Sequence, residues 1–394
     1  MSRGGGRLPA VDALRFVAAF LVVLNHTTLP HDLPAWAAPV RWLSTFGGAG
    51  VTLFLVLSGF SITLRWEQRP GGGFPVVAFW KRRFFRLYPT FWAAALVSFG
   101  LLVVAHGWSA VAHQGRPWLW FGGQVPVVVQ VLGYLTVVTA NIVPLAHMGR
   151  AWSLALEEHL YALYTVIQVR WGSTVRPVRL LGWAVALELL WPLLLAAVHP
   201  GWGAPTHGAL DNRELFMLFQ VPVFAAPWVA GWVAAQARAG HVALPRQLRS
   251  LRLGAALLAL AVLLRTWGGP VLRLPAGRVV APVDVLLTPL SALAFFIVVS
   301  AVVVPTVRRV PARPLVRRAV LVLASAGLWS YSLYLLHPPA LAIVEAHTRL
   351  PLAATLVLEW AFALVVAWVF FLLVERRWVA RAQAVPVHPS PVTA

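Results

Sequence analysis

Two ionisable side chains interrupt the first apolar stretch of the sequence. Arg15 and His26 lie eleven residues apart, so a helix brings them to one face, roughly 16 Å apart along its axis. Asp12 precedes Arg15 by three residues and is placed to pair with it. Histidine titrates near neutral pH, which makes His26 a candidate general base and Arg15 a candidate anion-binding group. For this stretch alone, a simpler interpretation stays open: Arg15 extends to a polar boundary and His26 marks the helix end.

Two more groups of polar side chains suit the same chemistry. Near the other end of the chain, Ser330, Tyr334 and His337 follow one another at spacings of four and three, which is one face of a helix. In the middle of the chain, Glu157 and Glu158 form an acidic pair at the edge of an apolar stretch. Such a pair is costly to bury unless it is used. Either carboxylate is a candidate to hold a histidine tautomer, and the sequence does not choose between them.

A basic run, Lys81 to Arg86, precedes the third apolar stretch. Arginine binds phosphate groups bidentately, so Arg83 and Arg86 are candidate phosphate ligands. Part of the run is also explained by the positive charge that membrane proteins carry on their cytoplasmic side.

The second apolar stretch carries Gly50, Phe54 and Ser58 at spacings of four. Small residues at such spacing let helices approach closely, and packing is the interpretation we favour for Gly50 and Gly59.

The composition indicates which kind of scaffold positions these groups. The chain has 394 residues, 60% of them hydrophobic and only 11% charged, with a mean hydropathy of +0.77. Apolar runs long enough to cross a hydrocarbon layer of about 30 Å recur along its length. We therefore expect an all-α, polytopic membrane bundle of about ten transmembrane helices. The expected spans are 10–28, 46–64, 87–106, 152–170, 180–199, 215–236, 252–268, 281–304, 319–340 and 352–374.

The distribution of positive charge predicts the orientation of these spans. Of the 32 Lys and Arg residues, 23 fall in segments that one orientation places on the same side, 8 fall in the alternate segments, and Arg15 lies within the first span. Because cytoplasmic loops carry the excess of Lys and Arg, we expect both termini in the cytoplasm. This orientation puts Arg15 on the cytoplasmic side and brings His26, Glu157 and His337 to a common depth near the outer face.

The rest of the sequence sets limits on domains and partners. We expect one membrane domain, residues 1–380, and a short disordered tail, 381–394. The apolar stretch 125–145 is interrupted by two prolines and an asparagine, and we expect it to be re-entrant or interfacial. The absence of cysteine excludes disulfides and cysteine nucleophiles. The net charge of +20 lies in short loops without a nucleic-acid-binding motif, so we expect membrane lipids and no nucleic acid as partners.

Together these motifs resemble the acyltransferase 3 family of membrane O-acyltransferases, which includes bacterial O-antigen acetylases and some macrolide acyltransferases. The resemblance extends from Leu8 to about Arg376. It rests on the Arg-ten residues-His signature of the first span, a glycine-to-Ser-Gly motif at 50–60, the paired arginines, and the elements at 152–161 and 330–337. Three positions depart from the family pattern, where Asp, a second Phe and Gln are common: Thr52, Leu55 and His159.

The resemblance implies a bacterial cytoplasmic-membrane enzyme. Its donor would be acyl-CoA, expected to be acetyl-CoA, supplied from the cytoplasm as a substrate rather than a permanently bound cofactor. No metal is expected. The acceptor would be a hydroxyl of a glycan or of a small molecule such as a macrolide.

The depth and spacing of the residues give each a hypothetical role in this reaction. The donor would contact a set of cationic and hydroxyl side chains: Arg15, Ser58, Arg83 and Arg86. His26 would be the base, or the nucleophile if an acyl-histidine forms, and both routes stay open. Glu157 or Glu158 would orient the imidazole, while Tyr334 and His337 would polarise the carbonyl or bind the acceptor.

Two functions from other classes remain as alternatives. A transporter or flippase for a glycan or lipid-linked product would also place charges within its helices. A non-catalytic membrane partner in a biosynthetic complex is the third possibility. Neither requires a phosphate site for coenzyme A, and a transporter typically shows internal repeats, which we do not detect in the sequence.

Overall fold

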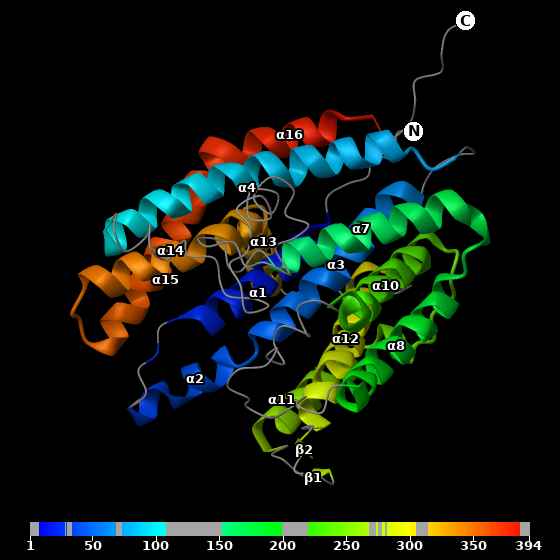
Figure 1. The fold of residues 1–394 in the computed structure, drawn as a ribbon, viewed down its shortest axis with the longest axis horizontal. Coiled ribbons are helices and arrows are strands. Elements are labelled where there is room, and N and C mark those ends of the chain that lie inside the picture. Colours follow the sequence, from blue (N-terminus) through cyan, green and yellow to red (C-terminus); the bar gives the residue numbers. More distant parts are fainter. Residues whose placement is uncertain are drawn as a thin grey trace, which may run out of the picture. The chain divides into compact units, whose positions relative to one another are not determined.

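A computed structural model describes residues 8–27, 29, 34–67, 73–107, 152–198, 220–267, 273–274, 278–279, 282–304 and 314–386. These residues are almost entirely helical, as the sequence predicts (Figure 1). Their only strands are β1 (Arg273–Leu274) and β2 (Arg278–Val279), which form one short antiparallel pair.

A helix lies within each of the ten predicted spans, as far as their residues are described. The long helices are α1 (Pro9–His26), α3 (Gly47–Glu67), α4 (Val76–His106), α7 (Trp152–Arg170), α8 (Pro177–Val198), α10 (Gln220–Ala239), α11 (Leu251–Trp267), α12 (Pro282–Val303), α13 (Pro314–Gly327), α14 (Ser330–His347) and α15 (Leu352–Phe370). The shorter ones are η1 (Ala35–Ala37), α2 (Ala38–Ser44), η2 (Gly172–Thr174), η3 (Gln247–Arg249), the π-helical turn η4 (Phe371–Glu375) and α16 (Arg376–Ala384).

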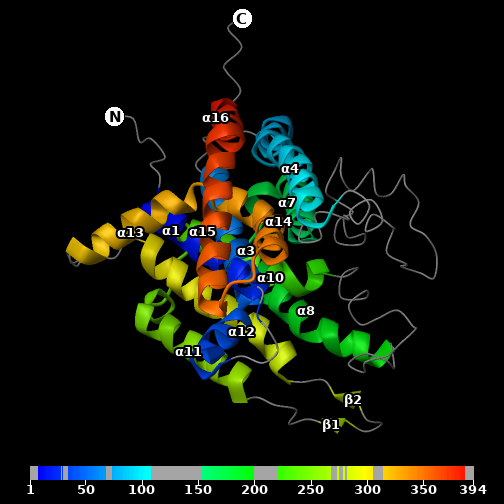
Figure 2. The same ribbon diagram turned by 90° about the vertical axis from the view of Figure 1, so that its left-hand side faces the viewer.

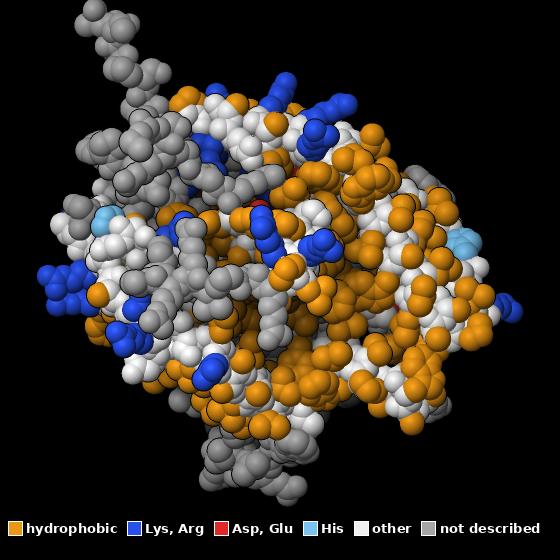
Figure 3. Space-filling view, turned by 180° about the vertical axis from the view of Figure 1, so that it is seen from behind, with side chains coloured by type: hydrophobic (Ala, Val, Ile, Leu, Met, Phe, Trp, Pro, Cys, Tyr) orange, Lys and Arg blue, Asp and Glu red, His pale blue; other side chains and the backbone are white. Residues whose placement is uncertain are grey.

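The described helices are those of a membrane protein. Five of them are long and apolar enough to cross a membrane, or six if α13 and α14 together form one bent span. Large apolar side chains stay exposed on these helices, among them Leu96 on α4 and Val357 on α15, which are 76% and 70% exposed. Figure 3 shows a face on which hydrophobic side chains predominate. An apolar surface of this extent is stable in lipid rather than in water.

Two predicted spans differ in form from the helices observed. The ninth, 319–340, is two helices, because α13 ends at Gly327 and α14 begins at Ser330. The Ser330 hydroxyl donates a hydrogen bond to the Gly327 carbonyl, 2.9 Å away, which satisfies an orphan acceptor at the end of α13. The tenth span, 352–374, continues without interruption through η4 into α16.

Other predicted boundaries differ as well. The third span begins earlier than predicted, since α4 opens at Val76 and includes the whole basic run. Residues 381–384, for which we predicted disorder, form the end of α16. The predicted interfacial segment 125–145 lies outside the described residues.

The chain divides into two compact units. Unit 1 consists of Met1–Ala18, Val51–Gly72 and Val166–Ser325; unit 2 consists of Ala19–Gly50, Gly73–Thr165 and Ala326–Ala394. The two histidines, the basic run, the acidic pair and α14 to α16 all belong to unit 2, whereas Arg15 and Ser58 belong to unit 1.

Unit 1 is built on a close approach of α3 and α10. A Cβ on Gly59 would collide with the backbone carbonyl of Trp228, and a Cβ on Gly231 would collide with that of Val56. The two glycines therefore let the two backbones touch, as small residues do in membrane helices. This confirms the packing role predicted for Gly59. Around this pair, α8 and α12 pack on α10, and α11 packs on α12.

Unit 2 is built around α4, which contacts α14 and α16. Its 31 residues give a length of about 46 Å. Helix α15 packs beside α14 and leads through η4 into α16, which lies alongside α4 (Figures 1 and 2). Helix α14 therefore lies against both α4 and α15.

Candidate functional site

Two histidines far apart in the sequence meet in unit 2. Nε2 of His337 on α14 lies 3.2 Å from Nδ1 of His26 at the end of α1, across a sequence separation of 311 residues. His337 is completely buried. The sequence predicts these two residues at one depth, and in the structure their imidazoles are within hydrogen-bonding distance of each other.

A proline in α14 determines which nitrogen of His337 carries the proton. Pro338 has no N–H, so the Tyr334 carbonyl lacks the donor that a helix would normally supply from residue 338. The Nδ1 atom of His337 lies 2.9 Å from that carbonyl and 3.1 Å from the Leu333 carbonyl. A carbonyl oxygen only accepts hydrogen bonds, so Nδ1 of His337 is the protonated nitrogen and donates. In neutral His337 the Nε2 atom that faces His26 is consequently the acceptor.

The same reasoning assigns the tautomer of His26. Its Nδ1 lies 2.8 Å from the Val22 carbonyl as well as 3.2 Å from the acceptor Nε2 of His337. Both neighbours require a donor, so Nδ1 of His26 carries a proton and shares it between them. A neutral imidazole has one protonated nitrogen, so the lone pair of His26 is on Nε2. This atom is the one that can take a proton from a substrate.

A tyrosine and a serine extend the histidine pair. The Tyr334 hydroxyl lies 2.6 Å from the Ser153 hydroxyl, which joins α14 to the first turn of α7. The Tyr334 ring is 6.2 Å from the His337 ring, centroid to centroid. The four side chains from α1, α7 and α14 therefore form one polar group, the histidine cluster: His26, His337, Tyr334 and Ser153.

The three arginines of the basic run on α4 contact different partners. Arg82 is 3% exposed and donates to two backbone carbonyls, those of Val385 at 2.7 Å and Gln383 at 3.0 Å. It therefore anchors the end of α16 to α4. This is a structural role, since both of its terminal nitrogens are used.

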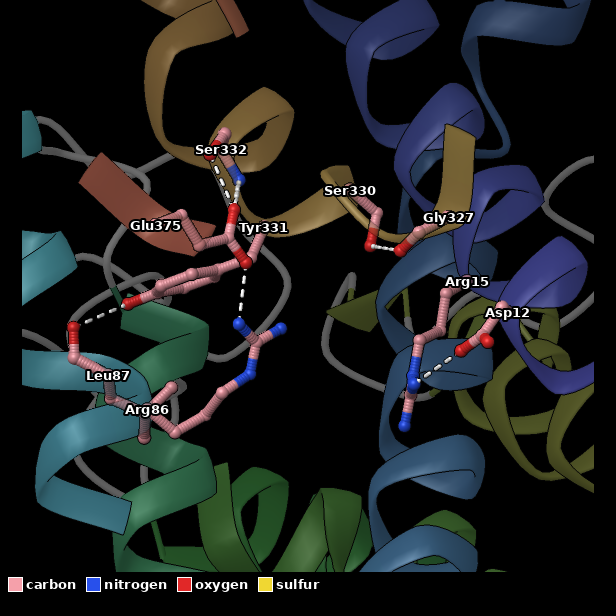
Figure 4. A network of polar contacts seen from close by, with 9 residues as sticks. All are labelled: Asp12, Arg15, Arg86, Leu87, Gly327, Ser330, Tyr331, Ser332 and Glu375. Atoms are coloured by element: carbon pink, nitrogen blue, oxygen red, sulfur yellow. Dashed lines mark hydrogen bonds and ion pairs between the residues drawn. The ribbon is translucent and has the colours of Figure 1, made fainter. Parts of the chain in front are cut away.

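Arg86 is paired with a carboxylate that the sequence analysis did not select. Its Nη1 lies 2.5 Å from Oε1 of Glu375, which is completely buried at the end of η4. The other oxygen of Glu375 accepts hydrogen bonds from the backbone N–H of Ser332, at 3.1 Å, and from its hydroxyl, at 2.5 Å. Figure 4 shows the three side chains pointing toward one another. Glu375 thus joins Arg86 of α4 to Ser332 of α14. Ser332 precedes His337 by five residues on the same helix.

Arg83 has neither an ion pair nor a hydrogen bond among the described residues. Its guanidinium carbon lies 5.4 Å from the ring centroid of Tyr161 and 6.0 Å from that of Phe79. Its Nε is buried and lacks a hydrogen-bond partner within the part of the chain described. Stacking on two aromatic rings holds the guanidinium in place while leaving its donors available.

The acidic pair of α7 lies with the arginines rather than with the histidines. Glu158 is 3% exposed and accepts a hydrogen bond from the Tyr88 hydroxyl at 3.4 Å. It is also close enough to Arg83 to interact electrostatically. Within the described residues, neither Glu157 nor Glu158 hydrogen-bonds a histidine. Ser153, one turn before Glu157, is the residue of α7 that reaches α14.

This placement differs from the predicted one for a physical reason. The direction in which each span crosses the membrane predicted Glu157 at the depth of His26 and His337, near the outer face. One helical turn, about 5.4 Å, separates Ser153 from Glu157, and the contacts show that it is Ser153 that meets the histidine cluster. The backbone carbonyls of Val22, Leu333 and Tyr334 contact the imidazole nitrogens in the positions expected for a carboxylate.

In unit 1, Arg15 forms the predicted ion pair. Its Nη1 lies 2.8 Å from Oδ1 of Asp12 (Figure 4). Its Nη2 donates to the Ser61 hydroxyl at 2.8 Å. Ser61 in turn donates to the Leu57 carbonyl. Ser58 is half-buried on the same helix, α3.

Sequence reasoning missed three residues of unit 2: Glu375, Pro338 and Ser153. Two of them have a signal that could have been read. Pro338 directly follows His337, and a proline inside a helix always leaves a carbonyl without its donor. Glu375 is one of the few acidic residues of the chain and follows a long apolar run. Ser153 has no comparable signal. No cluster of three His, Asp or Glu side chains that could hold a metal is found among the described residues.

Comparison with known proteins places the chain in a family. Residues 8–376 match the family model described as an acyltransferase domain. The chain is similar to the acyltransferase MdmB of Streptomyces mycarofaciens, with 28% identity over 244 residues, which is 58% of this chain and 57% of MdmB. It is also similar to a putative O-acetyltransferase of Staphylococcus aureus (strain COL), with 27% identity over 235 residues, 56% of this chain and 35% of that protein.

A third relative is the O-acetyltransferase OatA of Staphylococcus aureus (strain NCTC 8325), 28% identical over 164 residues, which is 41% of this chain and 24% of OatA. The chain thus spans less than two thirds of the length of these relatives. No solved structure matches the chain. Because the family model covers nearly all of its length, the chain belongs to the acyltransferase 3 family.

Proposed function

We propose that this protein is a membrane O-acyltransferase that moves a short acyl group from cytoplasmic acyl-CoA to a hydroxyl group. Acetyl is the acyl group that we propose first. The observation that carries the proposal is the contact between His26 and His337, which leaves a basic lone pair on Nε2 of His26. Membership of the acyltransferase family and the names of the relatives, an acyltransferase and O-acetyltransferases, support the same reaction.

In the proposed reaction, Nε2 of His26 takes the proton of the acceptor hydroxyl as its oxygen attacks the thioester carbonyl carbon. The positive charge that forms on His26 strengthens the hydrogen bond from Nδ1 to His337, because a charged donor bonds more strongly. His337 thus has the orienting role that an aspartate has in a serine protease. When the carbon–sulfur bond breaks, the imidazolium returns the proton to the thiolate. The products are an ester and free coenzyme A.

Two features of the histidine cluster suit the rest of this reaction. We assign the hydroxyls of Tyr334 and Ser153 as donors to a developing oxyanion or to an acceptor hydroxyl. A direct transfer fits the assigned tautomer, since the lone pair of Nε2 removes a proton in one step. An acyl-histidine would use the same lone pair as the nucleophile, and this route is the alternative mechanism.

Arg83 is the residue to which we assign the phosphates of the donor. Arg86 is neutralised by Glu375 in the protein itself, whereas Arg83 forms no ion pair within the described residues. The buried Nε of Arg83 and the buried Oε1 of Glu158 both lack hydrogen-bond partners there. A polar ligand or water that supplies these partners would remove the cost of burying them. Arg15 and Ser58 remain proposed donor contacts on the basis of family resemblance.

The proposed function includes the topology inferred from the positive charges. Ten spans with both termini in the cytoplasm would place the basic run on the side where acyl-CoA is made. The membrane would be the bacterial cytoplasmic membrane, and the acceptor a hydroxyl of a glycan or of a small molecule.

The experiment that tests the function is an assay of coenzyme A release by the purified protein. Acetyl-CoA is supplied with and without panels of glycan and macrolide acceptors, and free thiol and ester products are measured. An acyltransferase releases coenzyme A in proportion to ester formed and only with a competent acceptor. A transporter or flippase moves its substrate across proteoliposomes without releasing coenzyme A. A non-catalytic partner does neither.

A further inference from the structure

The last helix of the chain carries a pocket that the proposed reaction does not use. It has a volume of about 430 Å³ and is lined by side chains from η4 and α16 of unit 2: Leu373, Val374, Arg377, Trp378 and Arg381. Both arginines are exposed, and neither forms an ion pair within the described residues. The pocket thus offers two positive charges beside an aromatic ring and two aliphatic side chains.

The pocket has a fixed wall. The Trp378 ring stacks on Phe85 of α4, with centroids 6.0 Å apart and ring planes 13° apart. The guanidinium carbon of Arg381 lies 5.1 Å from the centroid of Trp378. Arg82 anchors the end of α16 through its hydrogen bonds to Gln383 and Val385. Trp378, and Arg381 through its contact with Trp378, are therefore positioned against α4 without a ligand.

A stripe of exposed apolar side chains leads into the pocket. Val365, Val369 and Leu373 follow one another at spacings of four and are 56%, 40% and 62% exposed. Arg377 and Arg381 continue the same spacing along α16. One surface of the last helix thus changes from apolar to cationic, with a tryptophan at the boundary. Tryptophan and arginine are typical of the level at which lipid head groups lie.

We propose that this pocket binds the head group of an anionic phospholipid. Its phosphate would lie between Arg377 and Arg381, since guanidinium groups bind phosphate oxygens bidentately. The glycerol region would contact Trp378, and an acyl chain would follow Leu373, Val369 and Val365. A free phosphate would use only the arginines and would leave the apolar stripe uncovered, which is why the two-part surface favours a lipid. The site is separate from the histidine cluster, and the inference does not depend on the proposed reaction.

The test is lipid binding to the full-length purified protein, measured by native mass spectrometry after delipidation in detergent. Phosphatidylglycerol and phosphatidylcholine with identical acyl chains are titrated in parallel. We expect phosphatidylglycerol to bind more tightly, and Arg377→Gln and Arg381→Gln each to weaken its binding by about fivefold. Neither substitution is expected to change the binding of phosphatidylcholine by more than about twofold, because a net-neutral head group gains little from the arginines.

Arg376→Gln is the matched control, because Arg376 is exposed on the same helix but does not line the pocket. The proposal is overturned if the two lipids bind equally, or if Arg376→Gln weakens phosphatidylglycerol binding as much as Arg377→Gln does. Competition with soluble phosphates tests whether the pocket binds a ligand other than a lipid. If inorganic phosphate or coenzyme A displaces phosphatidylglycerol at millimolar concentration, the pocket is a site for soluble phosphates and the lipid assignment is wrong.

Discussion

Nε2 of His337 accepts a hydrogen bond from Nδ1 of His26 across 3.2 Å, and the carbonyl of Tyr334 holds the opposite nitrogen of His337 at 2.9 Å. This chain of contacts extends from a backbone carbonyl through two imidazoles to the lone pair on Nε2 of His26. The carbonyl is available because residue 338 is proline. A backbone feature of α14 thereby sets the protonation pattern of a side chain on α1.

The first prediction concerns that proline. Pro338→Ala introduces an N–H that competes for the Tyr334 carbonyl, so His337 is no longer held in one tautomer. We expect kcat for acyl transfer to fall by roughly tenfold, the loss of about 1.4 kcal/mol of transition-state stabilisation. Thermal stability should stay the same or rise, because a proline inside a helix is unfavourable. Steady-state kinetics and a thermal melt in detergent measure the two effects.

Pro339→Ala is the matched control for this prediction. Pro339 occupies the next position of the same helix, and its replacement adds a donor for the Leu335 carbonyl. The carbonyls that Nδ1 of His337 contacts are those of Leu333 and Tyr334. Equal losses of kcat in the two variants would mean that helix geometry, and not the tautomer of His337, is what Pro338 supplies.

The second prediction separates two arginines of the basic run. Arg83→Gln should raise KM for acyl-CoA by about tenfold with little change in stability, because Arg83 has no ion pair within the described residues to lose. Arg86→Gln should instead destabilise the protein by about 3–5 kcal/mol, because it leaves the buried Glu375 carboxylate without its partner. Initial rates over a range of acyl-CoA concentrations and denaturant titrations distinguish these outcomes. The reverse pattern would show that Arg86 binds the donor.

The third prediction tests the coupling of Arg86 to Glu375. Glu375→Gln leaves a buried guanidinium without its charge partner and should destabilise the protein, as Arg86→Gln does. The double variant Arg86→Gln/Glu375→Gln should be more stable than the sum of the single losses by about 1–3 kcal/mol, since it removes both charges together. A double-mutant cycle on the free energy of unfolding gives this coupling directly. Strict additivity would mean that the ion pair contributes nothing.

The fourth prediction concerns the contact of α3 with α10. Gly59→Ala places a Cβ against the Trp228 carbonyl and should destabilise unit 1 by about 1–3 kcal/mol through overpacking. Gly182→Ala on α8 is the control, because a Cβ there has no atom within 4 Å. The control should be neutral or slightly stabilising, since alanine favours the helix. The idea fails if the two variants melt at the same temperature.

Much of the fold could be predicted because membrane-spanning helices appear in a sequence as long apolar runs. The residues 152–170 were predicted as one span and form α7 with the same bounds. The break between α13 and α14 could not be predicted in the same way. The run 319–340 contains no Lys, Arg, Asp or Glu and has no proline at the break. The turn after Gly327 is instead accompanied by a local capping contact of Ser330.

Those contacts of the site that depend on helical spacing and on the direction of each helix could be predicted from the sequence. The meeting of His26 with His337 follows from direction, since one residue ends α1 and the other lies well along α14. The partner of Arg86 does not follow from any local pattern, because Glu375 lies 289 residues away and is brought in by tertiary packing. The partners of the acidic pair could not be predicted for the same reason, because the contact of Glu158 with Tyr88 depends on how α7 lies against α4.

The central claim is that the lone pair on Nε2 of His26 removes the acceptor proton. Acceptor-dependent release of coenzyme A by purified His26→Ala tests it most directly, with His347→Ala, a change of an exposed histidine at the end of α14, as the control. The account predicts that His26→Ala lowers kcat by about 10²–10⁴ with an unchanged KM for acyl-CoA, while His347→Ala retains full activity. Full acyl transfer by His26→Ala would contradict it.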